Sequence, residues 1–318
     1  MQFVSYPVDK LHSRRPSIPR TANAVPAGDR SGVRWALTIR RVPEVFFVPE
    51  GDHYVPTELT RGPWDPDSQH AGPPAALIGR EIVRLNGGVD RRVGRITYEI
   101  LRPVPIAPLT VTAEVVRPGR TVELVEASLA DEQGEVIRAR AWRLREGVVD
   151  IPEGLSSEDG PGTLGSSPST LRPGFAPPGP SECPPGTFPD TGQDVGYHTA
   201  MEYRFVSGGF GEPGPAIAWM RMKVPLVEGE EPTPLERVLA AADSGNGVSS
   251  TLDWGTFLFI NVDLTVHVHR ELDGEWVCLD AITLPEPNGV GLADTALYDT
   301  EGPIGRGLQT LLVANREG

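Results

Sequence analysis

Asp243 is the residue whose position in this sequence most strongly suggests chemistry. The run Thr233-Pro234-Leu235-Glu236 is a capping box with proline at the first helical position, and it predicts a helix that Gly245-Asn246-Gly247 ends. Asp243 then stands in the last turn, where a carboxylate faces the negative end of the helix dipole. A purely structural acid would avoid this place, which favours a general base. The alternative is a solvated acid near a helix end.

The loop before an earlier expected helix contains His70 and Gly72. Pro73-Pro74 suits the opening turn of a helix, and apolar residues recur at helical spacing over 75–85. Free backbone N–H groups at Gly72 and Ala75, at the positive end of that helix, would polarise a bound carbonyl, with His70 nearby as a positioning group. The alternative is that His70 only caps or packs the entrance of the helix.

A strict alternation of apolar and polar residues over 261–270 predicts a strand with one core face and one outer face. His267-x-His269 has the spacing of two metal ligands. No third ligand stands at a telling spacing, so a polar outer face is the preferred interpretation and no metal is expected. The expected core face holds Val262, Leu264, Val266 and Val268, and the outer face holds Asn261, Asp263, Thr265, His267 and His269.

One pattern occurs twice, each time after an expected helix. Asp-x-x-Gly-x-(Val/Ile)-x-Arg stands at 131–138 and again at 299–306, as a turn between strands. Repetition of helix and sheet in the same order predicts duplication of one small α+β unit. Gln309 in the second copy stands where the first copy has Ala141, so the second copy gains a polar amide. Expected strands are 96–100, 110–115, 122–129 and 136–144 in the first copy, and 261–270, 276–283, 292–298 and 307–313 in the second.

The chain of 318 residues is long enough for two domains, each with its own core. Residues 1–42 are polar and are predicted to be a flexible N-terminal extension. Residues 149–195 are rich in Gly, Pro and Ser and are predicted to link the two copies as a loop. The domains are therefore expected at 43–148 and 196–318.

Composition narrows the class of partner. The 43 acidic residues outnumber the 29 basic ones, which argues against nucleic acid, because neutralising phosphates requires clustered Lys and Arg. No apolar run is long enough to span a bilayer, so no membrane partner is expected. Cys183 and Cys278 form neither a metal-ligand spacing nor a disulfide framework. We expect reduced thiols and a cytoplasmic protein.

Two motifs in the first copy carry a family resemblance. Gly62-Pro63-Trp64-Asp65 followed by His70-Ala71-Gly72-Pro73-Pro74-Ala75 is similar to the motif of bacterial thioesterase-family proteins. Together with the two tandem copies, it resembles the double hot-dog acyl-CoA thioesterases of type II, over about 43–314. The resemblance implies a tandem hot-dog fold, in which an antiparallel sheet wraps a central helix in each copy. It also implies hydrolysis of a fatty acyl-CoA to free acid and CoA by a homodimer that needs no cofactor.

The resemblance also assigns roles to single residues. In this family an Asp at the second helix, a hydroxyl or amide residue opening the next strand and a Gln on the last strand hold the nucleophilic water. These positions are Asp243, Asn261 and Gln309, with Asp243 as the base and the two amides as water holders. Type II enzymes commonly carry Thr where Asn261 stands, and Gly where Ala71 stands. An amide holds a water by hydrogen bonds but does not relay a proton as a hydroxyl does.

His70 and Gly72 are the expected substrate contacts, and a helix N-terminus of the neighbouring copy or of another subunit is the expected oxyanion site. Two other functions stay open. A hot-dog hydratase or dehydratase uses an Asp and a His five residues apart in one loop, as Asp65 and His70 are. An acyl-CoA-binding protein would keep the fold without turnover.

Overall fold

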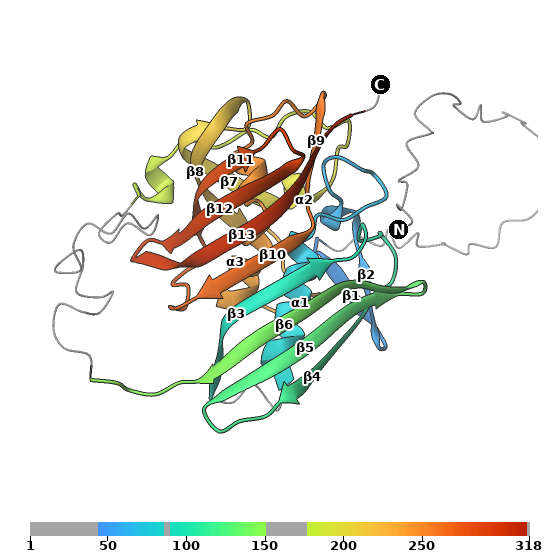
Figure 1. Ribbon diagram of the computed structural model, residues 1–318, viewed down its shortest axis with the longest axis vertical. Coiled ribbons are helices and arrows are strands. Elements are labelled where there is room, and N and C mark those ends of the chain that lie inside the picture. The colour runs from blue at the N-terminus through green and yellow to red at the C-terminus, as the bar shows by residue number, and fades with distance from the viewer. Residues whose placement is uncertain (1–43, 86–89, 151–176, 317–318) are drawn as a thin grey trace, which may run out of the picture. The chain divides into compact units, whose positions relative to one another are not determined.

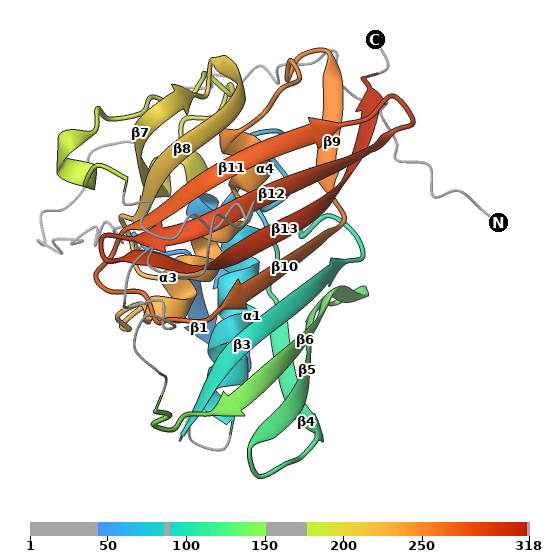
Figure 2. The same cartoon turned by 60° about the vertical axis from the view of Figure 1, so that its left-hand side comes forward.

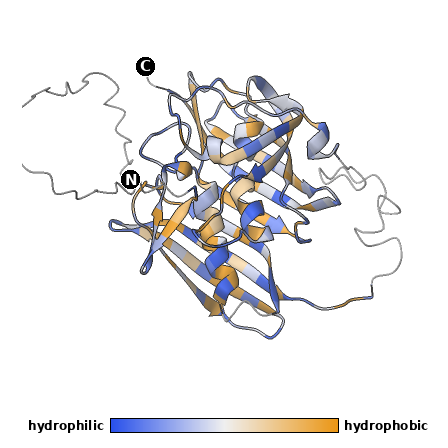
Figure 3. Ribbon diagram, turned by 180° about the vertical axis from the view of Figure 1, so that it is seen from behind, coloured by the Kyte–Doolittle hydropathy of each residue, from blue (hydrophilic) through white to orange (hydrophobic). Residues whose placement is uncertain are grey.

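The computed structural model describes residues 44–85, 90–150 and 177–316. These residues carry one antiparallel sheet of 11 strands and a separate two-stranded sheet (Figure 1). Hydrophobic and hydrophilic residues alternate along the strands (Figure 3). No helix in the described ranges is long and apolar enough to cross a membrane. The expected N-terminal extension and residues 151–176 of the expected linker lie outside the described residues.

The first half of the sheet follows one helix. Strand order across it is β4 (Thr110–Arg117), β5 (Val122–Asp131), β6 (Gly134–Arg145) and β3 (Arg91–Ile100), so β3, the first of these four in sequence, lies innermost. The helix α1 (Gly72–Arg84) precedes β3, and β1 (Phe47–Glu50) and β2 (His53–Pro56) form the separate two-stranded sheet.

The second half repeats that order and joins the first. Its elements are α2 (Tyr197–Ala200), β7 (Met201–Gly209), β8 (Glu212–Met222), α3 (Pro234–Ala242), α4 (Gly245–Val248), β9 (Phe257–Asn261), β10 (Asp263–Val268), β11 (Val277–Pro285), β12 (Val290–Asp299) and β13 (Gly302–Asn315). The order β11-β12-β13-β10 matches β4-β5-β6-β3, and antiparallel pairing of β3 with β10 makes one sheet of both halves (Figure 2).

The repeated sequence pattern makes the same contact in each half. Arg102 Nη1 donates to Asp131 Oδ2 at 3.0 Å, and Arg270 Nη1 donates to Asp299 Oδ2 at 2.8 Å. Partners lie 29 residues apart in the chain in both cases. Arg102 follows β3 and Arg270 follows β10, so each arginine ties the end of that strand to the turn between the last two strands of its half.

The helix starts follow the sequence signals. The Thr233 hydroxyl accepts the backbone N–H of Glu236 at 3.3 Å, and the Glu236 carboxylate accepts that of Thr233 at 3.0 Å, which confirms the capping box. α1 begins at Gly72, earlier than the apolar spacing indicated. α3 ends at Ala242, but the expected stop at 245–247 instead begins the short helix α4.

The second-half strand that was expected to alternate without a break is interrupted at Val262. β9 pairs Asn261 with Leu311, whereas β10 pairs Thr265 with Leu308. The register shifts by one residue between these pairs, as in a β-bulge. Such a shift moves the side chains that precede it to the opposite face of the sheet.

Because of the bulge, Val262 and Asn261 lie on the opposite faces of the sheet from those that the sequence predicted. Val262 is 43% exposed instead of buried, and Asn261 turns from the outer face to the core side, where it contacts Asp243. The remaining alternation holds: Leu264, Val266 and Val268 are buried, and His267 and His269 are exposed.

Residues 177–195, within the expected linker, pack against the second half. Trp219 Nε1 donates to Pro178 O at 2.8 Å, and Gly186 N donates to Tyr203 O at 2.7 Å. Cys183 and Cys278 are both buried free thiols. This part of the chain therefore supplies side chains to the folded unit, although it holds only one short 3-10 helix.

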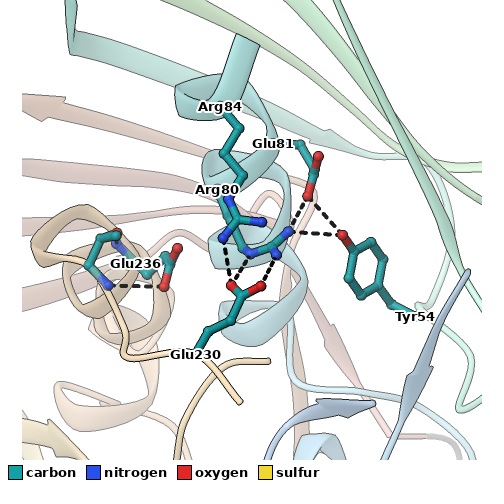
Figure 4. A network of polar contacts seen from close by, with 7 residues as sticks. Tyr54, Arg80, Glu81, Arg84, Glu230 and Glu236 are labelled. Carbon is teal, nitrogen blue, oxygen red and sulfur yellow. Dashed lines mark hydrogen bonds and ion pairs between the residues drawn. The ribbon is translucent and has the colours of Figure 1, made fainter. Parts of the chain in front are cut away.

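α1 and α3 pack against each other in opposite directions. Gly72 at the start of α1 lies beside Ala240 near the end of α3. At the far end, Arg80 Nε donates to Glu230, which precedes α3, at 2.8 Å, and Arg80 Nη1 donates to Tyr54 at 2.9 Å (Figure 4). The N-terminus of one helix is thereby brought to the C-terminus of the other.

The Arg102–Asp131 pair predicts acid sensitivity. The hydrogen bond from Arg102 holds the pKa of Asp131 below its ordinary value. Its stabilising contribution is complete above the ordinary aspartate pKa of about 4 and is lost as pH falls through the lower folded-state pKa. Asp131→Asn should lower the free energy of unfolding at neutral pH, and this deficit should shrink as the pH falls below about 4. Urea unfolding followed by circular dichroism at a series of pH values measures the free energy of unfolding of the variant and of the wild type.

Glu132→Gln, at an exposed position of the same turn, is the control and should leave the unfolding free energy nearly unchanged. A deficit in Asp131→Asn that is independent of pH would contradict the stabilising role of the ionised carboxylate.

Because α1 and α3 are in close contact at Gly72, we expect that no side chain larger than hydrogen fits there. A Cβ there would lie 2.4 Å from Ala240 O, a backbone atom that cannot turn away. Gly72→Ala should therefore destabilise the protein by about 1–3 kcal/mol. In the control Gly211→Ala the new Cβ meets nothing within 4 Å. Equal thermal unfolding temperatures for the two variants would show that the helices can separate without cost.

Candidate active site

The buried ends of α1 and α3 bring together two side chains from opposite halves of the sheet. His70 precedes α1 and Asp243 follows α3, and His70 Nδ1 lies 3.0 Å from Asp243 Oδ2. Each residue is 5% exposed. A buried carboxylate needs hydrogen bonds or a charged partner, so the contact with His70 is one of those that offset the cost of burying Asp243.

Two side-chain amides complete the surroundings of Asp243. Asn261 Nδ2 donates to Asp243 Oδ1 at 2.9 Å, and Gln309 Nε2 donates to the same oxygen at 3.3 Å and to Asp243 O at 3.0 Å. Gln309 Oε1 in turn accepts the backbone N–H of Asn246 at 3.1 Å. The structure thus gathers His70, Asp243, Asn261 and Gln309, which the sequence analysis singled out, around one carboxylate.

The amide nitrogens of Asn261 and Gln309 also make contacts that the sequence did not suggest. Asn261 and Gln309 were expected to hold a water; in addition, their nitrogens donate to Asp243 itself, and Asn261 Nδ2 also donates to Asp263 O at 3.3 Å. The amide nitrogens therefore orient the carboxylate. No described residue donates to the Asn261 side-chain oxygen, which leaves that acceptor available to a water.

The backbone N–H groups expected to be free at the start of α1 each lie within hydrogen-bond distance of an acceptor. Gly72 N donates to His70 Nδ1 at 3.1 Å, and Ala75 N donates to Ala71 O at 2.9 Å. Pro73 and Pro74 have no N–H to offer. The close approach of α3 therefore explains why a glycine stands at position 72, and a free backbone N–H donor is not needed to explain it.

His70 Nδ1 faces two partners that cannot both bond to it at once. An imidazole nitrogen accepts a hydrogen bond when it carries no proton and donates one when it does. Without the proton, Nδ1 accepts from Gly72 N; with the proton, it donates to Asp243 Oδ2. The two contacts are therefore alternatives that differ in the position of one proton.

Tyr197 fixes the plane of the His70 ring. The two rings stack with centroids 3.7 Å apart and an interplanar angle of 14°. Burial raises the pKa of Tyr197, so its hydroxyl stays protonated and donates to Ala240 O at 2.7 Å. Ser244 Oγ lies 2.9 Å from the same hydroxyl. Sequence reasoning missed Tyr197, because nothing near it in the chain marks a contact with α3.

A small cleft opens onto this group. Asp243 and His70 form part of its wall, and much of the rest is aromatic. The lining residues are Pro63, Trp64, His70, Phe188, Tyr197, Tyr203, Phe210, Asp243, Ser244, Asn246, Gly247, Val248 and Trp254. Phe188 comes from the expected linker, whose composition gave no sign of a role in a site.

Two other predicted groupings can be compared with the structure. His267 and His269 belong to no group of three or more His, Cys, Asp or Glu side chains suited to a metal within the described ranges. Asp65 accepts the N–H of Asp67 at 3.0 Å and the hydroxyl of Ser68 at 2.7 Å, while His70 faces Asp243. Asp65 therefore serves the turn of its own loop.

Comparison with known proteins agrees with the order of the two halves. Residues 60–144 match the family profile of the acyl-CoA thioesterase N-terminal domain, and residues 180–313 match that of the C-terminal domain. A search of curated protein sequences gave no match.

Solved structures share the fold at low sequence identity. A conserved protein with a hot-dog fold from Alicyclobacillus acidocaldarius has a TM-score of 0.61 and 13% identity over 84% of this chain and 95% of that one. The acyl-CoA thioesterase II TesB2 of Mycobacterium marinum has a TM-score of 0.54 and 14% identity over 86% and 97%. The tesB protein of Mycobacterium avium subspecies paratuberculosis has a TM-score of 0.53 and 14% identity over 86% and 95%.

These structural likenesses indicate a hot-dog fold, and the two profiles together span most of the described residues in the order N-terminal domain then C-terminal domain. The protein therefore belongs to the acyl-CoA thioesterase family.

Proposed function

We propose that this protein hydrolyses an acyl-CoA thioester to a free acid and CoA, with Asp243 as the general base. The observation that carries the proposal is the Asp243 carboxylate, which lies on the wall of the cleft and is held by His70, Asn261 and Gln309. A carboxylate fixed in this way, next to a space for substrate, is suited to take a proton from a water.

In the proposed reaction, Asp243 removes a proton from a water as its oxygen forms a bond to the thioester carbonyl carbon. The tetrahedral intermediate then collapses, the carbon–sulfur bond breaks, and the acid is released. The thiolate of CoA receives the proton that Asp243 took up. No cofactor is needed, because the water supplies both the hydroxyl of the acid and the proton of the thiol.

Asn261 and Gln309 act mainly by fixing Asp243. Two amide donors on Oδ1 fix the rotamer of the side chain and leave Oδ2 toward His70. The Asn261 side-chain oxygen, which accepts no hydrogen bond from a described residue, would hold the attacking water. His70 stabilises the carboxylate when its Nδ1 carries the shared proton.

The same proposal covers the organisation of the chain. We propose two tandem hot-dog domains at 43–148 and 196–318, in which each sheet wraps its helix, joined through 149–195. Matching strand orders in the two halves support duplication. Edge strands β4 and β7 favour association of two copies into a homodimer, and the free thiols Cys183 and Cys278 favour the cytoplasm.

Asp243→Asn tests the base directly. The amide keeps the shape of the side chain but cannot accept the proton, so thiol release from acyl-CoAs should fall by roughly a hundredfold to ten-thousandfold while ligand binding persists. Asp65→Asn is the matched control and should keep its activity, because Asp65 only caps its own loop. Release that is indifferent to Asp243 would sink the mechanism.

Asn261→Ala tests the positioning of the base. Loss of a hydrogen bond to a charged group should lower kcat by about tenfold to a hundredfold, with a smaller change in KM. His267→Ala is the control on the neighbouring strand, where the side chain is exposed on the outer face. Steady-state thiol release measures both variants, and equal kcat values would show that the Asn261 amide does not orient Asp243.

The same assays separate the two other candidate functions. Hydration of an enoyl-CoA without thiol release, abolished in Asp65→Asn, would identify a hydratase. Acyl-CoA binding without any turnover would identify a binding protein. The placement of His70 against Asp243 instead of Asp65 favours hydrolysis over hydration.

A further inference from the structure

A second cavity lies at the other ends of α1 and α3. Its volume is about 250 Å³, and its walls are the end of α1, the start of β3, the start of α3 and the end of β10. The length of α3, about 13 Å, separates it from Asp243. Among the described residues, none lines both this cavity and the cleft beside Asp243. The two are therefore separate places on the molecule.

The cavity corresponds to the candidate active site when the two halves of the chain are exchanged. The site lies where the start of α1 meets the end of α3, and the cavity lies between the start of α3 and the end of α1. Leu85 takes the C-cap position of α1, as Asp243 does that of α3, and Ala141 stands where Gln309 stands in the other half. The cavity thus has neither the carboxylate nor the glutamine amide, and it is suited to binding without hydrolysis.

The inner wall of the cavity is apolar. Val93, Val238, Val268 and Leu272 line it, and each of them is at most 7% exposed. An engineered apolar cavity of about 150 Å³ is large enough to bind benzene. A volume of about 250 Å³ therefore has room for a hydrocarbon chain, whose removal from water would favour binding.

Three charged side chains that reach solvent mark the opening of the cavity: Arg92, Glu146 and Glu271. Arg92 Nη2 lies 2.5 Å from Glu146 Oε1 and 3.7 Å from Glu271 Oε2. No described residue accepts a hydrogen bond from Arg92 Nε or Nη1. A guanidinium has five N–H donors in a planar fork that suits a carboxylate, so a carboxylate at the opening would find free donors on Arg92.

We propose that this cavity is a second, non-catalytic site that binds a fatty acid, with the alkyl chain against the apolar inner wall and the carboxylate at Arg92. An apolar interior with a few polar groups at one end fits an amphiphile. The free donors on Arg92 favour an acid over an alkyl amine, whose ammonium would have to compete with Arg92 for the two glutamates. Such an acid is also what the proposed hydrolysis releases, but binding here needs none of the residues around Asp243.

Calorimetric titration of the full chain with straight-chain fatty acids, from hexanoic to dodecanoic acid, tests the site without any turnover. Affinity should rise about threefold to fourfold for each added methylene until the cavity is filled. The same series should be found in Asp243→Asn, because the cavity lies at the far end of α3. Decylamine should bind at least about tenfold more weakly than decanoic acid.

Arg92→Gln tests the head-group contact. The variant should bind decanoic acid about tenfold more weakly and decanol as the wild type does, because only the acid uses the charge. Arg140→Gln is the matched control, since Arg140 pairs with Glu126 at an exposed position and does not line the cavity. Equal affinities of the two variants for decanoic acid would overturn the assignment of Arg92.

Leu235→Trp tests the place of the alkyl chain. Leu235 lines the cavity at a partly buried position, so the larger ring should occupy the space and weaken decanoic acid and decanol alike. Leu144→Trp, at an exposed position outside the cavity, is the control. Thermal unfolding of both variants shows that they are folded, and unchanged binding by folded Leu235→Trp would overturn the site.

A decanoic acid that carries a diazirine near its chain end locates the bound chain directly. After irradiation, mass spectrometry at the level of single residues should find the label on Val238, Val268 or Leu272. Label confined to Trp64, Phe188 or Trp254 would place the acid in the cleft beside Asp243 and overturn the second site. Binding that depends on Arg92, without hydrolysis of any acyl-CoA, would support the second site and overturn the thioesterase.

Discussion

The close approach of α1 and α3 at their opposite ends is the constraint on which the rest of the site depends. Gly72 allows the start of one helix to lie against the backbone of Ala240 in the other. Only because these ends meet does His70, from the first half of the sheet, reach Asp243, from the second. Neither half contains the candidate site by itself, so joining the halves through β3 and β10 is also a condition of the proposed function.

The hydrogen-bond partners of Asp243 explain how its carboxylate can be buried where the ends of α1 and α3 meet. An ionised carboxylate removed from water without partners would cost several kcal/mol, and here amide donors and an imidazole replace the lost hydration. Each partner comes from a different element: Asn261 from the end of β9, Gln309 from β13 and His70 from the loop before α1. The sheet register therefore sets the chemistry, since a shift of one residue in β13 would turn Gln309 away from the carboxylate.

Local signals in the sequence predicted α1, α3, the strands β3 to β6 and β10 to β13, and the chemically unusual Asp243, because caps, prolines and periodicity act over a few residues. They did not predict the short helices α2 and α4 or the strands β1, β2, β7 and β8. The duplicated Asp-x-x-Gly turn also predicted that helix and sheet follow each other in the same sequence order in both halves. The bulge at Val262 could not be predicted, because it depends on the register in which β9 and β10 pair with the distant strand β13, and with it the direction of Asn261 was missed. Tyr197 and Phe188 were missed for the same reason, since their contacts with His70 and Phe210 arise only after distant segments pack.

The central claim is that Asp243 activates a water that attacks the thioester directly. A single turnover in water labelled with oxygen-18, with enzyme in excess over a substrate that the wild type hydrolyses, tests it most directly. Direct attack predicts that the released acid carries the label in this first turnover and that the peptide containing Asp243 stays unlabelled. Unlabelled acid in the first turnover, with label subsequently found in Asp243, would show that the carboxylate attacks the thioester itself and would contradict the account.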